Sequence, residues 1–264
     1  MSPFIVAPRI RVREGRPEQG ARSVAQEVAV AIVHDASTYA VMMATPQNLE
    51  DFAIGLSLTE GVIAAQDQVR SIEVVETEFG IEVRLWLDPE RAAALASRRR
   101  TMAGPTGCGL CGVESLEQAR RSPVRTPFDI APLTASQIQA AMASLEPAQA
   151  LGRETRAVHA AGFWRPDRGL VLAREDVGRH NAVDKLAGAM ARQGVDAAGV
   201  LLLTSRVSVE LVQKAAAIGA PVIAAVSAPT HLAIQTAQAA GVTLLAVVRQ
   251  DGFEVFTHAY RLSL

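Results

Sequence analysis

Cys108 and Cys111 are the only cysteines among 264 residues, and just two residues separate them within the run 103–113. Glycines at positions 104, 107, 109 and 112 of this run remove side-chain bulk around both sulfurs and open backbone conformations closed to other residues. The run therefore predicts an accessible loop that carries a dithiol. A dithiol can bind a metal, form a disulfide or carry sulfur as a persulfide.

The residues alone leave all three kinds of chemistry open, but not equally favoured. A tetrahedral zinc site needs four ligands, whereas the chain offers one cysteine pair and five histidines without paired spacing. A thioredoxin-type dithiol normally opens a long helix after an early strand, whereas this pair lies mid-chain among glycines. A persulfide carrier needs an accessible thiol that reaches two partners in succession, and a glycine-rich loop suits that requirement.

Polar side chains follow several short apolar runs in the second half of the chain, where strands are expected to give way to helices. Backbone N–H groups at a helix N-terminus bind anions, and arginine and serine side chains add donors. Because the carboxyl ends of strands share one edge of an open α/β sheet, we expect these loops to line one cleft. The residues concerned are Asp176, Arg179, His180, Ser205, Arg206, Ser208 and Ser227.

Each of these loops also has a simpler interpretation as the start of a helix. Asp176 could cap a helix, as could a serine of each later loop. Asp184 and Lys185 could form a solvated surface pair. Capping is the more ordinary role for any one loop, but three such loops in one layer favour a shared cleft.

The apolar patterns predict two regions of different architecture. Alternating apolar residues predict strands in the first half, and Thr45 predicts the start of a helix as its N-cap, with Pro46 in the first helical position. After the proline-containing stretch 121–133, strands and helices alternate, which predicts an α/β layer. The expected strands are 27–33, 39–44, 72–78, 81–87, 157–163, 169–173, 200–203, 222–226, 242–248 and 254–257, and the expected helices are 46–60, 89–97, 136–145, 208–218 and 230–240.

The composition excludes several classes of function. The formal net charge is −1 and one fifth of the residues are charged, so we expect no general affinity for nucleic acid or for anionic membranes. No run approaches the roughly 18 apolar residues that span a bilayer, and the N-terminus lacks the pattern of a secretory signal. We therefore expect a cytoplasmic protein whose thiols face a reducing compartment.

Arginine is concentrated in three places along the chain. Five arginines lie in the first 25 residues, and two groups of three flank the cysteine run, at 98–100 and at 120, 121 and 125. They could form solvated faces, or an electropositive surrounding that lowers the pKa of a thiol and attracts phosphate. Residues 1–25 show little periodicity and predict a basic tail or a poorly ordered arm.

Further motifs are spread over the chain, at 41–46, 49–53, 58–61, 175–180, 184–186, 208, 212–214 and 226–228. Together with the cysteine run at 106–112, they resemble the formate dehydrogenase accessory sulfurtransferase family, FdhD. The likeness runs from about residue 26 to the C-terminal end.

The resemblance implies a sulfurtransferase that takes persulfide sulfur from a cysteine desulfurase. It would pass the sulfur to the molybdenum cofactor, bis(molybdopterin guanine dinucleotide), as formate dehydrogenase activity requires. Cys108 would carry the persulfide, with Cys111 as its partner. The cofactor would be bound as a substrate through its guanine nucleotides, by the strand-end residues above and by Val248, Arg249, Gln250, Asp251, Gly252 and Phe253. A homodimer is also implied, whereas the zinc-binding pattern of true deaminases is absent.

The expected fold class is α/β. The resemblance implies a cytidine-deaminase-like three-layer domain over 123–264, and the N-terminal region, 26–122, predicts a smaller α+β domain that ends in the cysteine loop. Two other functions remain possible on the residues alone. One is a chaperone that binds the molybdenum cofactor without moving sulfur, and the other is a dithiol oxidoreductase.

Overall fold

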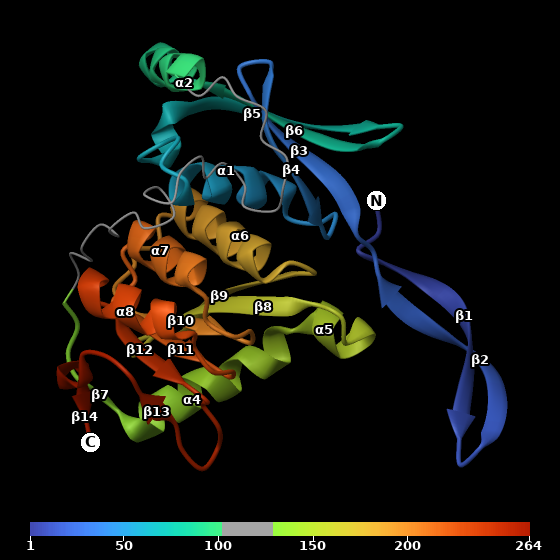
Figure 1. Ribbon diagram of the computed structural model, residues 1–264, viewed down its shortest axis with the longest axis vertical. Coiled ribbons are helices and arrows are strands. Elements are labelled where there is room, and N and C mark those ends of the chain that lie inside the picture. Colours follow the sequence, from blue (N-terminus) through green and yellow to red (C-terminus); the bar gives the residue numbers. More distant parts are fainter. Residues whose placement is uncertain (102–128) are drawn as a thin grey trace.

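The computed structural model describes residues 1–101 and 129–264, which form two lobes in contact and an arm that projects beyond them (Figure 1). Cys108 and Cys111 lie outside the described residues, as does the domain boundary predicted near residue 122. Within the described parts of the chain, no helix is both long enough and apolar enough to cross a membrane.

The N-terminal lobe is a four-stranded sheet in the order β4–β3–β6–β5, with one face covered by a helix. Alternate residues of the central strands, among them Val30, Ile32, Val83 and Leu85, are buried in one cluster with Phe52 of that helix, as expected for a sheet with one face toward a core. The strands and the hairpin predicted here are confirmed. The elements are β3 (Val28–His34), β4 (Ser37–Ala44), α1 (Leu49–Thr59), β5 (Val69–Thr77), β6 (Gly80–Leu87) and α2 (Pro89–Thr101).

The C-terminal lobe is built on a six-stranded sheet in the order β13–β12–β11–β10–β8–β9. The strands β10, β11 and β12 are parallel, while β8 pairs antiparallel with both β9 and β10. A small parallel pair, β7 with β14, lies apart. The elements are β7 (Leu133–Thr134), α4 (Ala135–Leu145), α5 (Ala150–Thr155), β8 (His159–Arg165), β9 (Gly169–Asp176), α6 (Arg179–Arg192), β10 (Val200–Leu203), α7 (Val209–Ala217), β11 (Val222–Ala225), α8 (His231–Ala240), β12 (Thr243–Ala246), β13 (Glu254–Val255) and β14 (Leu262–Ser263), with short 3₁₀ turns at Gln66–Gln68, Glu146–Ala148 and Ala259–Arg261.

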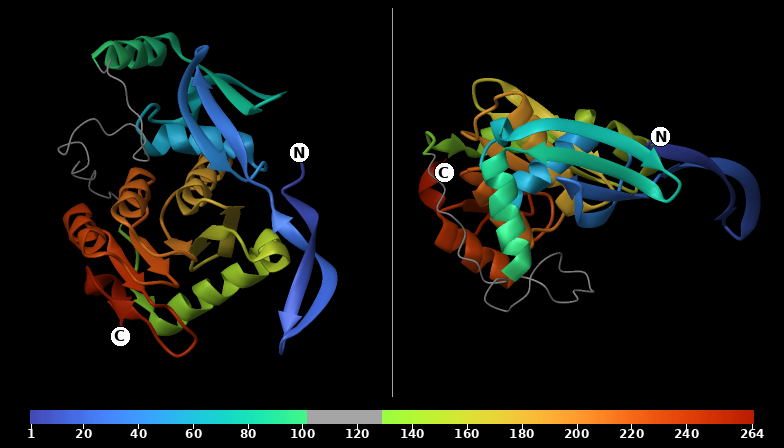
Figure 2. Two further views of the ribbon diagram at one scale, coloured as in Figure 1. Left: turned by 45° about the vertical axis from the view of Figure 1, so that its right-hand side comes forward. Right: turned by 90° about the horizontal axis from the view of Figure 1, so that it is seen from above.

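Helices cover both faces of this second sheet (Figures 1 and 2). Leu201 and Ile223 pack into the cluster that contains α6, α7 and α8, whereas Leu202 and Val222 pack with α4 on the opposite face. Burial on both faces explains why these strands read as unbroken apolar runs. The structure thus has the predicted α/β class and a three-layer C-terminal lobe.

The two lobes meet where α1 crosses α6, and glycine allows their backbones to touch. A Cβ atom on Gly55 of α1 would lie 1.7 Å from the carbonyl oxygen of Asp184, and one on Gly188 of α6 would lie 1.9 Å from that of Asp51. Any side chain at either position would force the helices apart. The two lobes are therefore in direct backbone contact at this crossing.

The helix expected to begin at Thr45 begins later, at Leu49. Its N-cap is Asn48, in a left-handed conformation with φ of 52°. Thr45 instead binds the other lobe: its N–H donates to Asp176, and its hydroxyl accepts from the N–H of Val177. A contact 131 residues away along the chain therefore overrides the local capping signal.

The prediction of a tail over residues 1–25 is wrong. These residues form a β-hairpin, β1 (Phe4–Arg13) paired antiparallel with β2 (Arg16–Ala25) along its whole length. Glu14 and Gly15 make the two-residue turn, both with positive φ, which matches the right-handed twist of a hairpin. The hairpin extends away from the N-terminal sheet (Figures 1 and 2), and we call it the arm.

Contacts to the body are found near the root of the arm. The guanidinium of Arg22 donates to the carbonyl oxygen of Thr155 at 2.9 Å, and Ser23 bonds to Glu154, both in α5. The N-terminal amino group pairs with Glu76 of β5 at 2.9 Å. These contacts fix where the arm leaves the body.

Candidate functional site

The predicted loops of the C-terminal lobe lie together along one edge of its sheet. Because β8 is antiparallel to both β9 and β10, the carboxyl end of β9 lies at the same edge as those of β10, β11 and β12. Neighbouring loops are hydrogen-bonded: the N–H of Val207 donates to the oxygen of Ala228 at 3.2 Å, and that of Val248 to the oxygen of Ala225 at 3.0 Å. We call this edge the strand-end row, made up of the loops 176–181, 204–208, 226–230 and 247–253.

His180, in the first turn of α6, faces the start of α7. Its Nε2 atom lies 3.3 Å from the hydroxyl of Ser208, the N-cap of α7, and 3.7 Å from a carboxylate oxygen of Glu210. Burial and the nearby Arg179 guanidinium lower the pKa of His180 to about 4, although Glu210 acts in the opposite direction. The imidazole is therefore neutral at physiological pH.

Arg179 is the first residue of α6, and its guanidinium lowers the pKa of two histidines of the row, His180 and His159. Its Nε atom is buried and has no hydrogen-bond partner among the described residues. The N-cap of α6 is Gly178, which has no side chain to cap the helix, and the hydroxyl of Ser208 makes no capping bond to α7. By contrast, α8 is capped by Thr230, whose side chain accepts from the N–H of Ala233. Two helix N-termini of the described row therefore keep donors that an anion could use.

His159 belongs to this site and was not predicted from the sequence. It is the first residue of β8 and pairs with Asp176, which places it at the strand-end row. Burial and the Arg179 guanidinium lower its pKa, with Asp176 opposing. An isolated histidine before an apolar strand carries no local signal, because only the antiparallel register brings it to this edge.

Asp176 lies beneath the row rather than on its surface. The side chain is fully buried and pairs with the Lys185 ammonium at 2.6 Å. It also accepts from Gly178 N–H at 2.7 Å and from the Asn181 side-chain amide at 3.0 Å. With these partners, Asp176 positions the first turn of α6 and presents no free surface to a ligand.

The interpretation of Asp184 and Lys185 as a solvated surface pair is wrong. Both side chains are fully buried, and each binds the N-terminal lobe: Lys185 donates to the oxygen of Thr45 at 2.8 Å, and Asp184 accepts from Thr59 at 2.6 Å. Asp184 also accepts from Lys214 of α7 at 2.8 Å. Burial works against the charge of Lys214, but Asp184 and Glu60 outweigh it and raise the Lys214 pKa.

The remaining predicted residues of the second and third loops, Ser205, Arg206 and Ser227, differ in exposure. Ser205 is buried, and its hydroxyl donates to the backbone oxygen of Arg206. The side chain of Arg206 is exposed, and Ser227 is half-buried. Of these three, Arg206 is the residue most accessible to a ligand.

The stretch 248–253 forms the far end of the row. Val248 is buried and Phe253 packs on the core, whereas Arg249, Gln250 and Asp251 are exposed. The Arg249 guanidinium donates to the backbone oxygens of Val226 and Val248, and its N–H donates to the oxygen of Gly252 at 2.8 Å. The stretch is thus a closed turn attached to the neighbouring loop.

The donor set of the row fits a phosphate or diphosphate group. Arg179 and Arg206 supply positive charge, and the first turns of α6 and α7 supply backbone N–H groups. The carboxylate of Glu210 opposes an anion close to α7, so the α6 end of the row is the better position. The fold and this row define a two-lobed α/β protein in which one edge of the sheet carries donors suited to an anion.

The chain belongs to the FdhD/NarQ family, whose model matches residues 25–263. It is 54% identical over 261 residues to a protein of Agrobacterium fabrum named "Sulfur carrier protein FdhD", covering 97% of this chain and 95% of that relative. A protein of the same name from Cupriavidus necator is 49% identical, with 96% and 88% covered. The predicted likeness from about residue 26 onward is confirmed.

The fold is also similar to a solved structure. A crystal structure described as a formate dehydrogenase accessory protein, from Desulfotalea psychrophila, matches with a TM-score of 0.76 and 25% identity. The match covers 99% of this chain and 100% of the solved chain. The similarity therefore extends over the whole architecture and not over one lobe.

Proposed function

We propose that this protein is a sulfur carrier that serves formate dehydrogenase. The observation that carries the proposal is the 54% identity, over nearly the full chain, to a relative named as a sulfur carrier. The only two cysteines of the chain, Cys108 and Cys111, supply the thiols such a carrier needs. We place the protein in the cytoplasm, where these thiols stay reduced.

Cys108 takes the sulfur from a cysteine desulfurase and holds it. Its thiolate attacks the terminal sulfur of the desulfurase persulfide, the desulfurase cysteine leaves as a thiolate, and Cys108 becomes the persulfide. Cys111 then attacks the inner sulfur, which forms a Cys108–Cys111 disulfide and releases the outer sulfur as hydrosulfide. The two thiols supply the two electrons for this release, and a cellular dithiol reduces the disulfide afterwards.

The acceptor is the molybdenum cofactor, bis(molybdopterin guanine dinucleotide), bound as a substrate along the strand-end row. The positive charge of Arg179 and the helix N-termini support this placement, because each guanine dinucleotide carries a diphosphate. Neutral His180 and His159 can donate or accept hydrogen bonds without adding charge. The functional unit we propose is a homodimer that interacts with a cysteine desulfurase and with formate dehydrogenase.

The test loads the protein with a cysteine desulfurase and cysteine. The peptide with residues 103–113 should gain about 32 Da, one sulfur atom, and Cys108→Ala should abolish the gain. Cys111→Ala should still load but fail to activate apo-formate dehydrogenase. Loading of the Cys108→Ala variant, together with normal activation, would overturn the proposal.

A chaperone that only binds the cofactor is the main alternative, and the same variants separate the two functions. A sulfur carrier with both cysteines replaced by alanine should still bind the cofactor and fail only in activation. A chaperone that grips the cofactor with its thiols should lose binding. Arg179→Ala is the matched control: it should weaken cofactor binding about tenfold, or roughly 1.4 kcal/mol, and leave loading of Cys108 unchanged.

A further inference from the structure

The arm has two chemically different faces, because side chains alternate along each strand. One face of β1 carries aliphatic residues, with Val6 67%, Ile10 68% and Val12 66% exposed. Their partners on β2, Ser23, Gln19 and Pro17, share this face. The opposite face carries arginines 9, 11, 13, 16 and 22. We call the first the aliphatic face of the arm.

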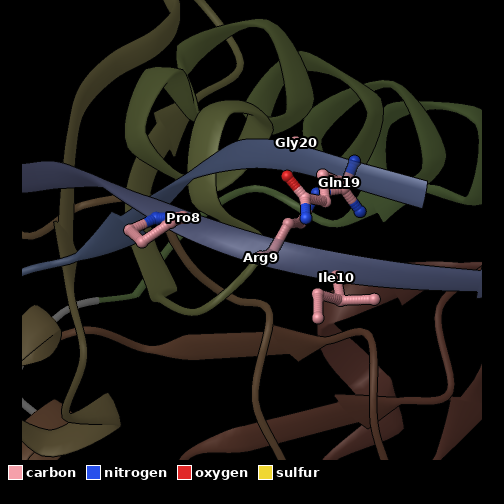
Figure 3. Close-up of a pocket in the computed structure, with 5 residues that line it drawn as sticks. All are labelled: Pro8, Arg9, Ile10, Gln19 and Gly20. Atoms are coloured by element: carbon pink, nitrogen blue, oxygen red, sulfur yellow. The ribbon is translucent and has the colours of Figure 1, made fainter. Parts of the chain in front are cut away.

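A two-stranded ribbon that exposes aliphatic side chains to water has little stability of its own. A two-stranded hairpin alone is marginally stable at best, and exposed aliphatic side chains in a row are typical of an interaction surface. Pro8, Arg9, Ile10, Gln19 and Gly20 line a hollow in the ribbon, which gives a partner side chain a place to pack (Figure 3). The aliphatic face of the arm therefore has the properties of a protein interaction surface.

A second unpartnered apolar surface lies on the same chain. The outer face of the N-terminal sheet, turned away from α1, carries Val41 and Met43 of β4, which are 58% and 51% exposed, and Trp86 of β6, which is 38% exposed. Register places Ala29 opposite Met43 and Ala31 opposite Val41, so the middle of this face is flat. The arm does not cover this face in its own chain, because the arm extends away from the N-terminal sheet (Figures 1 and 2).

We propose that the aliphatic face of the arm packs on this outer sheet face of a second copy of the chain, and reciprocally. This contact specifies how the homodimer of the proposed function forms, and it rests on that proposal. Size supports it: a ribbon of ten residues per strand is ~33 Å long and ~10 Å wide. Two reciprocal contacts then bury ~1,300 Å² in total, within the range of stable interfaces, which begins near 1,200 Å².

Charge supports the same pairing. Residues 1–25 contain five arginines and two glutamates, whereas the hairpin 69–87 beside the outer sheet face contains four glutamates and two arginines. Glu73 of β5 is exposed and lies opposite Arg84, on the same sheet face as Trp86. In this contact the arginines lie on the face of the arm that is turned away from the sheet, so the opposite net charges of the arm and of the hairpin act at long range and steer the approach of the two copies.

The first experiment compares the two faces of the arm by sedimentation of the full-length protein at micromolar concentration. The triple variant Val6→Thr, Ile10→Thr, Val12→Thr keeps β-branched side chains and should weaken dimerisation at least tenfold. The matched variant Arg9→Gln, Arg11→Gln on the opposite face should remain a dimer. A monomeric wild type, or a triple variant as dimeric as the wild type, would overturn the contact.

The second experiment identifies the surface that the arm meets. In a Cys108→Ala, Cys111→Ala background, chains with Ile10→Cys are mixed with chains with Val41→Cys and oxidised. A disulfide between the two kinds of chain is expected, and cross-links only between two Ile10→Cys chains would exclude the sheet as the docking surface. Persulfide loading of Cys108 in the triple variant is measured separately, so that failure of sulfur transfer is distinguished from failure of the contact.

Discussion

The lobe interface and the arm differ in how far their side chains are buried and paired. At the α1–α6 crossing, backbones touch at Gly55 and Gly188, and buried charges of one lobe find their partners in the other. Along the arm, charged and aliphatic side chains alike are exposed. The buried polar groups at the lobe crossing thus have partners within one chain, whereas the arm exposes its side chains, and in the contact proposed above they meet a second copy.

The largest expected difference between the lobe interface and the arm is the loss of unfolding free energy when a glycine is replaced by alanine. Gly55→Ala should lower the free energy of unfolding by about 3 kcal/mol or more, because the new Cβ would overlap the backbone of α6. Gly20→Ala in the arm meets no atom within 4 Å and should change stability by less than about 0.5 kcal/mol. Urea unfolding of both variants measures the contrast. Equal effects would mean that the helices are not in backbone contact.

The next difference between the lobe interface and the arm is the cost of removing a positive charge. Lys185→Met leaves the fully buried Asp176 without its cation, which should cost roughly 3 kcal/mol of unfolding free energy. Arg13→Met on the exposed arm should cost less than about 0.5 kcal/mol. Thermal unfolding of the two variants tests this. A mild effect at Lys185 would show that its pair with Asp176 is dispensable to the lobe interface.

The smallest expected effect is a pH dependence of the unfolding free energy, which arises from His180 in the C-terminal lobe. His180 has a pKa of about 4 when folded against about 6.5 when unfolded. The unfolded chain therefore takes up the proton first, and stability falls as the pH drops from about 6.5 to about 4, with no further change below. The loss should be between roughly 1 and 3 kcal/mol, reduced by partial exposure.

The control for this pH dependence uses the same comparison of body and arm. His180→Gln should reduce the slope of the stability curve between pH 4 and 6.5, measured by urea unfolding at several pH values, and leave the part that His159 contributes through its own lowered pKa. Removal of residues 1–25, which contain no histidine, should leave the slope unchanged. A slope that is unchanged in His180→Gln would assign the acid sensitivity to other groups.

Much of the sheet and of the strand-end row was predictable, because the signals are local. Four consecutive apolar residues followed by a polar turn, as at Val200–Leu203, indicate a strand buried on both faces. Chain direction then places the following loops at one edge. The roles of Asp176 and Lys185 were not predictable, because a charged pair near a helix start looks the same whether it faces solvent or another lobe.

The sequence of the arm contains a hairpin signal, but its content of arginine and proline favours a tail. Ile10, Arg11, Val12 and Arg13 alternate, and Glu14 with Gly15 forms the turn. The density of arginine and proline favoured a tail, and no apolar partner segment nearby suggested a core. A hairpin that packs on no core of its own chain is difficult to predict, since hydrophobic periodicity signals burial and these side chains are exposed.

The buried contacts of Thr45, Asp176 and Lys185 have a consequence for how the molecule unfolds. Since each lobe supplies partners for charges buried in the other, neither lobe is complete by itself, and we expect a single calorimetric transition with equal van't Hoff and measured enthalpies. The same contacts make the covalent link between the lobes unnecessary for their association. Two fragments divided between residues 101 and 129 should reassemble into the intact body when they are refolded together.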